Sequence, residues 1–194
     1  MNTNYLISLK REFFNSEADY GMGQILLYDK NNDSRVANCE IKKILPKNLS
    51  ILLTGLIQGA NIFSKIKVFE KSGLFNEDMG AGTPFPCEDI EWACRATQSG
   101  HTGILIPEVI VYHHNKRKIN SKKALETIHG YDYGRGAYYA SLIARGVPNV
   151  WDFWKDTFIN SHNIKSTNHL DRVSRELVGA SKYFDFIKTK YFSR

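Results

Sequence analysis

Two adjacent carboxylates, Glu88 and Asp89, stand where an extended, proline-rich segment gives way to a helical pattern. Pro84 and Pro86 hold the preceding backbone extended, because proline fixes its own φ and disfavours the α region for the residue before it. Apolar residues recur with helical spacing from Ile90 onward, so both acids lie in the first turn of a predicted helix. A carboxylate with a rigid base and an open tip suits a general base or a metal contact. The alternative is that the acids only stabilise the helix N-terminus.

Histidines and basic residues follow the last predicted strand. His113 ends this strand and His114 comes next, and the alternation of side chains along a strand would send only one of them into a cleft. Cations at the mouth of a cleft could neutralise a departing diphosphate, and the alternative is a surface charge cluster. The cations are Lys116, Arg117 and Lys118.

Two glycine-containing segments are candidates for contacts with a ligand. The loop 78–83 leads directly into the acidic pair, so we expect it, with Gly82, to shape an acceptor cleft. Residues 59–63 predict a strand in which Gly59 lets a ligand approach the backbone closely. The alternative for Gly59 is a structural bulge.

The remaining pattern predicts alternating helices and strands. Gly73 and Gly100 are placed to end helices, and Gly21 and Gly23 are expected to break the chain. We expect helices at 4–14, 65–72 and 88–99, and strands at 24–28, 51–54, 59–63, 102–106 and 109–113. The C-terminal part is helical in pattern, and its last helix has a seam for a core or a partner helix, formed by Leu170, Val173, Leu177, Ala180, Phe184, Ile187 and Tyr191.

The composition fits one folded domain with an appendage. The chain has 194 residues, of which 42% are apolar, and this is enough for a core. It contains no apolar run long enough for a transmembrane helix, and its N-terminus lacks the pattern of a signal peptide. Cys39, Cys87 and Cys94 form no Cys-x-x-Cys pair, so we expect reduced thiols in a cytoplasmic protein.

The net charge of +6 is concentrated in the C-terminal part. Residues 1–114 carry 11 Lys and Arg against 13 Asp and Glu, whereas residues 115–194 carry 15 against 7. This excess indicates an anionic partner, such as a membrane surface, a lipid diphosphate or a nucleic acid, or else a solvated helical surface. Trp151, Phe153 and Trp154 could lie at a membrane interface or pack against the domain. No base-reading motif supports binding to nucleic acid.

Several segments carry a resemblance to a known family. In order they are Gly59-Ala60-Asn61-Ile62-Phe63, the helix end Gly73-Leu74-Phe75-Asn76-Glu77, the acidic-pair helix, the turn Gly100-His101, a strand ending in Pro107 and a strand ending in His113. This order and spacing resemble the second half of family 2 glycosyltransferases, which have the GT-A fold. Asn76 stands where the family has Asp, and His101 where it has Tyr. The segment Tyr133-Gly134-Arg135-Gly136 also resembles one that follows the catalytic region in many bacterial members.

The resemblance implies roles for several residues. It implies that Asp89 is the base of an inverting displacement, with Glu88 beside it, and that His113 helps to hold a metal–diphosphate. Gly59, Asn61, Gly82, Trp92, Lys116 and Arg117 are the substrate-binding residues that we expect. The family's first half carries nucleotide-binding strands and an Asp-x-Asp that binds Mn²⁺ or Mg²⁺. No Asp-x-Asp occurs in this chain, so we expect the donor half of the site to be absent.

The sequence therefore predicts an α/β fold: a partial GT-A-like mixed sheet with flanking helices, followed by a helical C-terminal tail. We expect the acceptor and base half at 1–115 and a basic helical tail at 116–194. The implied function is transfer of a sugar from a nucleotide-sugar donor to a sugar or lipid-linked acceptor hydroxyl, in a truncated or split form that is inactive alone. Its expected partners are a missing N-terminal half or further copies of the chain, and it would act in the cytoplasm, peripheral to a membrane. The alternative is a non-catalytic interaction or remnant domain.

Overall fold

The computed structural model describes residues 4–32, 41–114, 116–159 and 167–192. It confirms an α/β protein with a mixed four-stranded sheet, flanking helices and C-terminal helices. Cys39 lies outside the described residues, and Cys87 and Cys94 are not in a disulfide. The described elements are α1 (Tyr5–Leu9), the π-helix η1 (Lys10–Phe14), β1 (Tyr20–Leu27), β2 (Lys43–Leu45), the 3-10 helix η2 (Gly59–Asn61), β3 (Ile62–Ser64), α2 (Ile66–Ser72), α3 (Glu88–Gln98), β4 (Gly103–His113), α4 (Lys122–Ala144), α5 (Val150–Ile159) and α6 (Thr167–Phe192).

The chain forms two compact units that are not contiguous in sequence. Unit 1 consists of Met1–Phe75 and Asp89–Ala124 and holds the sheet. Unit 2 consists of Asn76–Glu88 and Leu125–Arg194 and holds the C-terminal helices. This division differs from the boundary expected near residue 115, because the loop before α3 belongs with the helices.

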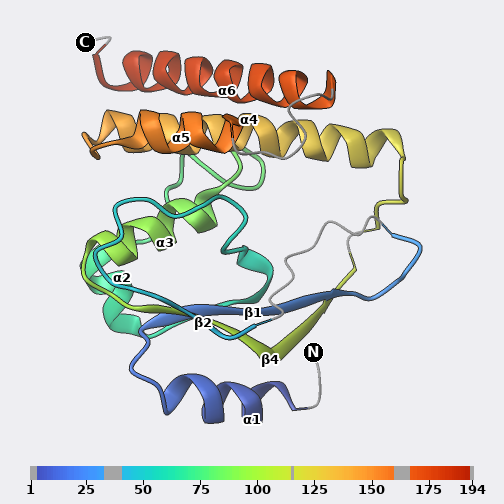
Figure 1. The fold of residues 1–194 in the computed structure, drawn as a ribbon, viewed down its shortest axis with the longest axis vertical. Coiled ribbons are helices and arrows are strands. Elements are labelled where there is room, and N and C mark those ends of the chain that lie inside the picture. Colours follow the sequence, from blue (N-terminus) through green and yellow to red (C-terminus); the bar gives the residue numbers. More distant parts are fainter. Residues whose placement is uncertain (1–3, 33–40, 115, 160–166, 193–194) are drawn as a thin grey trace. The chain divides into compact units, whose positions relative to one another are not determined.

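The sheet of unit 1 has the strand order β2-β4-β1-β3. The two central strands, β1 and β4, are parallel, and each short edge strand is antiparallel to its neighbour. Figure 1 shows α1 on one face of this sheet and α2 and α3 on the other. Phe13 packs below the sheet with the buried Ile104 and Val109 of β4. Above it, the buried Tyr20 meets Trp92 edge-on, with ring centroids 5.7 Å apart.

Asn61 secures an irregularity between the two central strands. The register shifts between Gly23 and Gln24, where Pro107, Glu108 and Val109 of β4 have no partner in β1. The Asn61 side-chain amide donates to the carbonyl oxygens of Gln24 at 2.9 Å and Val109 at 2.8 Å. A Cβ on Gly23 would lie 2.0 Å from the Val109 carbonyl oxygen, so only glycine allows this approach.

The prediction of two strands at 102–106 and 109–113 is therefore wrong. The structure has one continuous strand, β4 (Gly103–His113), because the residues around Pro107 form a bulge rather than a break.

Three further local predictions are corrected. Gly59 starts η2 rather than a strand, and the extended backbone begins only at Ile62. Residues 51–54 form no strand. Gly21 and Gly23 lie inside β1 rather than breaking the chain, since both allow close approach of β4 or β3. The helix ends are confirmed: Gly73 has φ 76° after α2 and Gly100 has φ 88° after α3.

A hydrogen bond between a histidine and an aspartate joins the start of β1 to the start of β4. The Nδ1 atom of the buried His101 lies 3.1 Å from Asp19 Oδ2, and Lys67 Nζ lies 2.6 Å from the other oxygen. Burial raises the pKa of Asp19, but the hydrogen bonds from Lys67 and His101 outweigh it and leave this pKa below its ordinary value. The sequence analysis did not identify Asp19, because its partners lie far along the chain.

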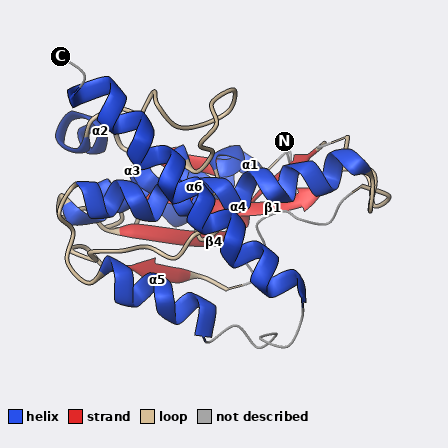
Figure 2. Ribbon diagram, turned by 90° about the horizontal axis from the view of Figure 1, so that it is seen from above, coloured by secondary structure: helices blue, strands red, loops and turns tan. Residues whose placement is uncertain are grey.

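Unit 2 is organised by a close crossing of α4 and α6, which Figure 2 shows from above. A Cβ on Gly136 of α4 would lie 1.8 Å from the Glu176 carbonyl oxygen of α6. A Cβ on Gly179 of α6 would lie 2.1 Å from the Tyr133 carbonyl oxygen of α4. The two backbones thus touch through glycines, which explains Gly136 in the Tyr-Gly-Arg-Gly segment.

Charged residues fill the space beside this crossing. Asp132 and Glu176 are each only 1% exposed. Arg135 binds both acids, and its distance to Glu176 Oε1 is 2.9 Å. Arg175 donates to Asp132 at 2.8 Å, and Arg172 lies 3.3 Å from Glu176. These three arginines therefore compensate buried carboxylates, and this accounts for part of the basic excess of the C-terminal sequence.

The aromatic segment of α5 divides into a buried and an exposed part. Trp154 is 2% exposed, stacks on Tyr139 and donates its indole N–H to Glu176 Oε2 at 2.8 Å. Trp151 is 54% exposed. None of the described helices has the length and apolar content needed to cross a membrane.

Candidate functional site

The loop before α3 is folded tightly within unit 2. Gly80 donates its N–H to the Phe85 carbonyl at 2.9 Å, and Thr83 bonds back to the Gly80 carbonyl through both its N–H and its hydroxyl. Phe85 is 4% exposed and packs against Tyr183 and Phe186 of α6, with ring centroids 5.4 and 5.7 Å away. The glycine-rich loop is therefore held by the C-terminal helices. Gly82, the residue expected to shape a cleft, lies exposed at its tip with φ 91°.

Asp89 is the site residue whose orientation is best defined. Its Oδ2 accepts the Gly59 backbone N–H at 2.8 Å, and its Oδ1 accepts the Ile90 N–H at 2.7 Å. The structure thus brings together Gly59 and Asp89, two residues that the sequence analysis selected separately. The carboxylate is half-buried in the first turn of α3, where backbone N–H groups favour negative charge.

Glu88 is the neighbouring carboxylate and the first residue of α3. Its side chain lies against Gly80, since a Cβ there would come within 2.9 Å of the Glu88 carboxyl carbon. Gly80 has φ 114°, a backbone conformation that favours glycine. The absence of a Cβ at Gly80 also leaves room for the Glu88 side chain. Glu88 therefore contacts the loop, whereas Asp89 contacts η2.

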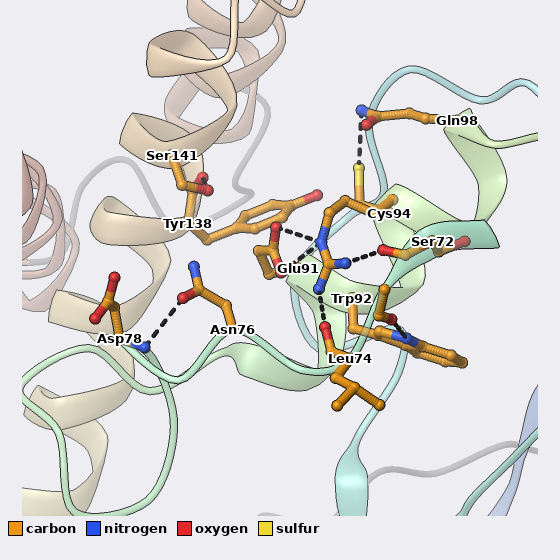
Figure 3. A network of polar contacts seen from close by, with 12 residues as sticks. Ser72, Leu74, Asn76, Asp78, Glu91, Trp92, Cys94, Gln98, Tyr138 and Ser141 are labelled. Carbon is orange, nitrogen blue, oxygen red and sulfur yellow. Dashed lines mark hydrogen bonds and ion pairs between the residues drawn. The ribbon is translucent and has the colours of Figure 1, made fainter. Parts of the chain in front are cut away.

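Behind the acidic pair, α3 is locked to the end of α2 by three side chains (Figure 3). Arg95 donates to the backbone carbonyls of Ser72 and, at 2.7 Å, of Leu74. The buried Glu91 accepts from Arg95 Nε at 2.9 and 3.0 Å. Trp92 donates its indole N–H to the Gly73 carbonyl at 3.1 Å. Three successive carbonyls at and just after the end of α2 are thus bonded by side chains of α3, and this fixes the direction of α3.

Two residues that were expected to bind substrate instead make buried contacts within the folded chain. Trp92 is 0% exposed and stacks on Phe69, with ring centroids 4.8 Å apart. Asn61 is 3% exposed, and its amide is used across the bulge, while its Oδ1 accepts the Tyr5 hydroxyl at 3.1 Å. We no longer assign substrate contacts to either residue. The sequence analysis did not foresee these contacts between α3 and the end of α2. Glu91 and Arg95, which are four residues apart on a predicted helix, could have indicated an ion pair there.

The histidines and cations lie at the carboxyl end of the central strands. His113 is half-buried, pairs with Leu27 of β1 and accepts the Tyr28 N–H on its carbonyl oxygen at 3.2 Å. His114 is exposed, and its ring lies 5.4 Å from that of Tyr28. The role of His113 toward a metal–diphosphate stays a prediction.

The basic residues after β4 differ in their surroundings. Lys116 is exposed with φ 54°, Arg117 is half-buried, and Lys118 forms a backbone bridge with Asn32. Contacts of Lys116 and Arg117 with a substrate also stay predictions.

Replacement of Arg95 tests the locking of α3. Arg95→Met should lower the free energy of unfolding by about 2–3 kcal/mol, because it removes the ion pair with the buried Glu91 and the two hydrogen bonds to backbone carbonyls. Arg11→Met is the matched control, since Arg11 is exposed and forms a surface ion pair with Glu12, so its loss should change stability by less than about 0.5 kcal/mol. Urea unfolding followed by circular dichroism measures both. Equal effects would show that the Arg95 contacts do not stabilise α3.

A Mn²⁺ or Mg²⁺ site is not complete in the described part of the chain. These residues include no group of three or more His, Cys, Asp or Glu that could hold a metal ion. Hard divalent cations require several oxygen ligands, so His113 by itself does not fit such an ion. No step is assigned to a metal held by these residues.

The start of α3 thus presents a half-exposed carboxylate that is fixed by two backbone N–H groups. Such a group can accept a proton from a hydroxyl that lies within hydrogen-bonding distance. Comparisons with protein-family models, with curated proteins and with solved structures find no match to this chain.

Proposed function

We propose that this chain supplies the acceptor and base part of an inverting glycosyltransferase of the family 2 type. Asp89 accepts the proton of an acceptor hydroxyl as that oxygen bonds to the anomeric carbon of the donor sugar. The bond from this carbon to the nucleoside diphosphate breaks in the same displacement, and the diphosphate leaves with the bonding electrons. Lys116 and Arg117 compensate the charge of the leaving diphosphate.

The observation that supports this function is the fixed orientation of Asp89. A general base must hold its carboxylate where the hydroxyl will lie, and the Gly59 N–H fixes one oxygen of Asp89 at 2.8 Å. Glu91, two residues further along the same helix, is buried and accepts a hydrogen bond from Arg95, so its role is structural. The two acids therefore have different surroundings on one helix, and Asp89 is the one suited to chemistry.

The donor part of the reaction requires groups that this sequence does not contain. No Asp-x-Asp occurs among the 194 residues. We therefore expect donor binding to depend on a separate or additional polypeptide segment that carries this motif.

A binding and turnover experiment tests the proposed function. Calorimetry of the purified chain with nucleotide sugars and Mn²⁺ should show no micromolar binding, and the chain alone should transfer no sugar. Addition of a donor-binding segment that carries Asp-x-Asp should produce transfer. Micromolar binding by the chain alone would show that it holds a complete donor site. Failure of every donor-binding segment to produce transfer would contradict catalysis.

The alternative function is a non-catalytic interaction domain. It is favoured by Asn61 and Trp92, since both are used by the fold although they were expected to bind substrate. Under this alternative, Asp89 serves only to hold η2 against α3.

Contact with an anionic membrane is a further prediction for residues 116–194. Trp151 is exposed beside Lys155, and each basic residue near such a surface contributes on the order of 1 kcal/mol. In liposome flotation at low salt, the chain should bind anionic vesicles more than neutral ones, and Trp151→Ala should reduce this binding. No preference between the two kinds of vesicle would remove the prediction.

A further inference from the structure

The side chain of Asn61 is fixed by three hydrogen bonds in the interior of unit 1. Its Nδ2 atom donates to the carbonyl oxygens of Gln24 at 2.9 Å and Val109 at 2.8 Å, and its Oδ1 atom accepts the Tyr5 hydroxyl at 3.1 Å. These bonds use both amide hydrogens and the amide oxygen, so the amide has one orientation. Asn61 is 3% exposed, and water therefore does not compete for these bonds.

The bulge between β1 and β4 explains why this position needs an amide. The carbonyl oxygens of Gln24 and Val109 come from neighbouring strands at the register shift, and both lie within hydrogen-bonding distance of one nitrogen atom. Of the side chains with the length of Asn61, only asparagine offers two N–H donors on one atom. Aspartate would direct negative charge at both oxygens, and leucine would remove both hydrogen bonds.

Asn61 and the hydrogen-bond donor to Asp89 lie on the same tight turn. The Asn61 N–H closes η2 by donating to the Gln58 carbonyl at 3.3 Å, and the Gln58 N–H donates to Met22 Sδ of β1 at 3.1 Å. The turn is therefore attached to the sheet on both sides of Gly59, whose N–H donates to Asp89 Oδ2 at 2.8 Å. A 3-10 helix rises only about 2 Å per residue, so a displacement of Asn61 moves the Gly59 N–H with it.

The orientation of the Asp89 carboxylate thus depends on how η2 is held. Its Oδ1 accepts a hydrogen bond from Ile90 of its own helix, whereas its Oδ2 accepts one from η2. Loss of the Asn61 bonds would let η2 move and would release Oδ2, so that the carboxylate could turn. A misplacement of about 1 Å in an active site can lower the rate about a hundredfold.

We propose that Asn61 is a positioning residue, which holds the Gly59 N–H against Asp89 and thereby orients the base. This role in catalysis rests on the proposed function, since a base serves only a reaction. It differs from the substrate contact that the sequence suggested, because the buried amide acts through η2 without touching a substrate. All the residues that carry this link belong to unit 1.

NMR spectroscopy of the full chain tests the positioning without any need for turnover. The Gly59 amide signal should move with pH as Asp89 takes up a proton, because a carboxylate accepts a stronger hydrogen bond than a carboxylic acid does. Asp89→Asn should abolish this movement and so identifies its source. Asn61→Leu should remove most of it. Leu45→Ala is the matched control, since it leaves a cavity at β2, away from the bulge, and should keep the movement.

A folded Asn61→Leu variant that keeps the full movement of the Gly59 signal would overturn the proposal. Tyr5→Phe decides the case in which Asn61→Leu does not fold. It keeps the ring but removes the hydroxyl that the Asn61 amide oxygen accepts, so the movement should be smaller than in the wild type. In that case, an unchanged movement in Tyr5→Phe would overturn the proposal.

Turnover of the assembled transferase separates this role from the proposed function. Asn61→Leu should lower kcat about 10–100-fold and change the acceptor KM by less than about twofold, whereas Leu45→Ala should stay near the wild type. If the Gly59 movement is lost but kcat is kept, Asn61 does not position the base, and the proposed function stands. If the NMR results are as expected but the wild type transfers no sugar, the proposed function fails, and Asn61 still orients the Asp89 carboxylate.

Discussion

Gly136→Ala should strongly destabilise unit 2, although alanine is the better helix former. The added Cβ would lie 1.8 Å from the Glu176 carbonyl oxygen and 2.9 Å from the Ala180 nitrogen, both of which are backbone atoms of α6. Backbone cannot turn away as a side chain can, so α4 and α6 must separate. This separation would strain the contacts of Arg135 and Trp154 with Glu176, which is only 1% exposed. We expect a loss of about 3 kcal/mol or more.

The same substitution at Gly130 provides a control within the same helix. A Cβ on Gly130 would meet no atom within 4 Å, so alanine there should gain up to about 1 kcal/mol of helix propensity. Thermal and urea unfolding of the two variants should therefore shift in opposite directions from the wild type. A Gly136→Ala variant as stable as the wild type would mean that the two helices are not in backbone contact.

The sequence predicted local structure well where one residue type decides the conformation. Gly73 and Gly100 end α2 and α3 as expected, because a helix that ends in a residue with positive φ strongly favours glycine there. The prolines before Glu88 likewise placed the start of α3 correctly. These signals are local, so they need no knowledge of what packs against them.

The errors arose where distant residues decide the structure. Pro107 looked like the end of a strand, but Asn61 supplies the hydrogen bonds that hold the bulge within β4. Trp92 looked like a residue for a ligand, but the end of α2 accepts its N–H. Arg135 was counted as part of a basic surface, although it pairs with two buried acids. Neither periodicity nor composition shows which distant groups will meet.

The candidate site was predicted in its residues more than in its arrangement. Glu88 and Asp89 were selected together, yet Glu88 contacts the loop at Gly80 and Asp89 contacts Gly59. The loop 78–83 was selected only for a cleft beside the acidic pair. The segment that follows it is anchored by Phe85 on α6, a contact that joins residues about a hundred positions apart in the sequence.

Asp89→Asn should lower turnover of the assembled transferase by about 10²–10⁴ while the fold is kept. Asparagine has nearly the same shape, and its amide oxygen can still accept the Gly59 N–H that Asp89 Oδ2 accepts at 2.8 Å. Its NH2 group cannot accept the Ile90 N–H that Asp89 Oδ1 accepts at 2.7 Å, so one bond at the helix start is lost. The fold should survive this loss, but the group can no longer take a proton from the acceptor hydroxyl. Unfolding curves close to those of the wild type, together with the loss of turnover, would assign the effect to chemistry.

A matched variant at the neighbouring acid separates the two carboxylates. Glu88→Gln removes the neighbouring charge and should cause a smaller loss of turnover, since Glu88 lies against Gly80 rather than beside Gly59. If Asp89→Asn keeps near-normal turnover in the assembled enzyme, the base is another residue. If Glu88→Gln causes the larger loss, that residue is Glu88, and the Gly59 contact then serves only to hold η2 against α3.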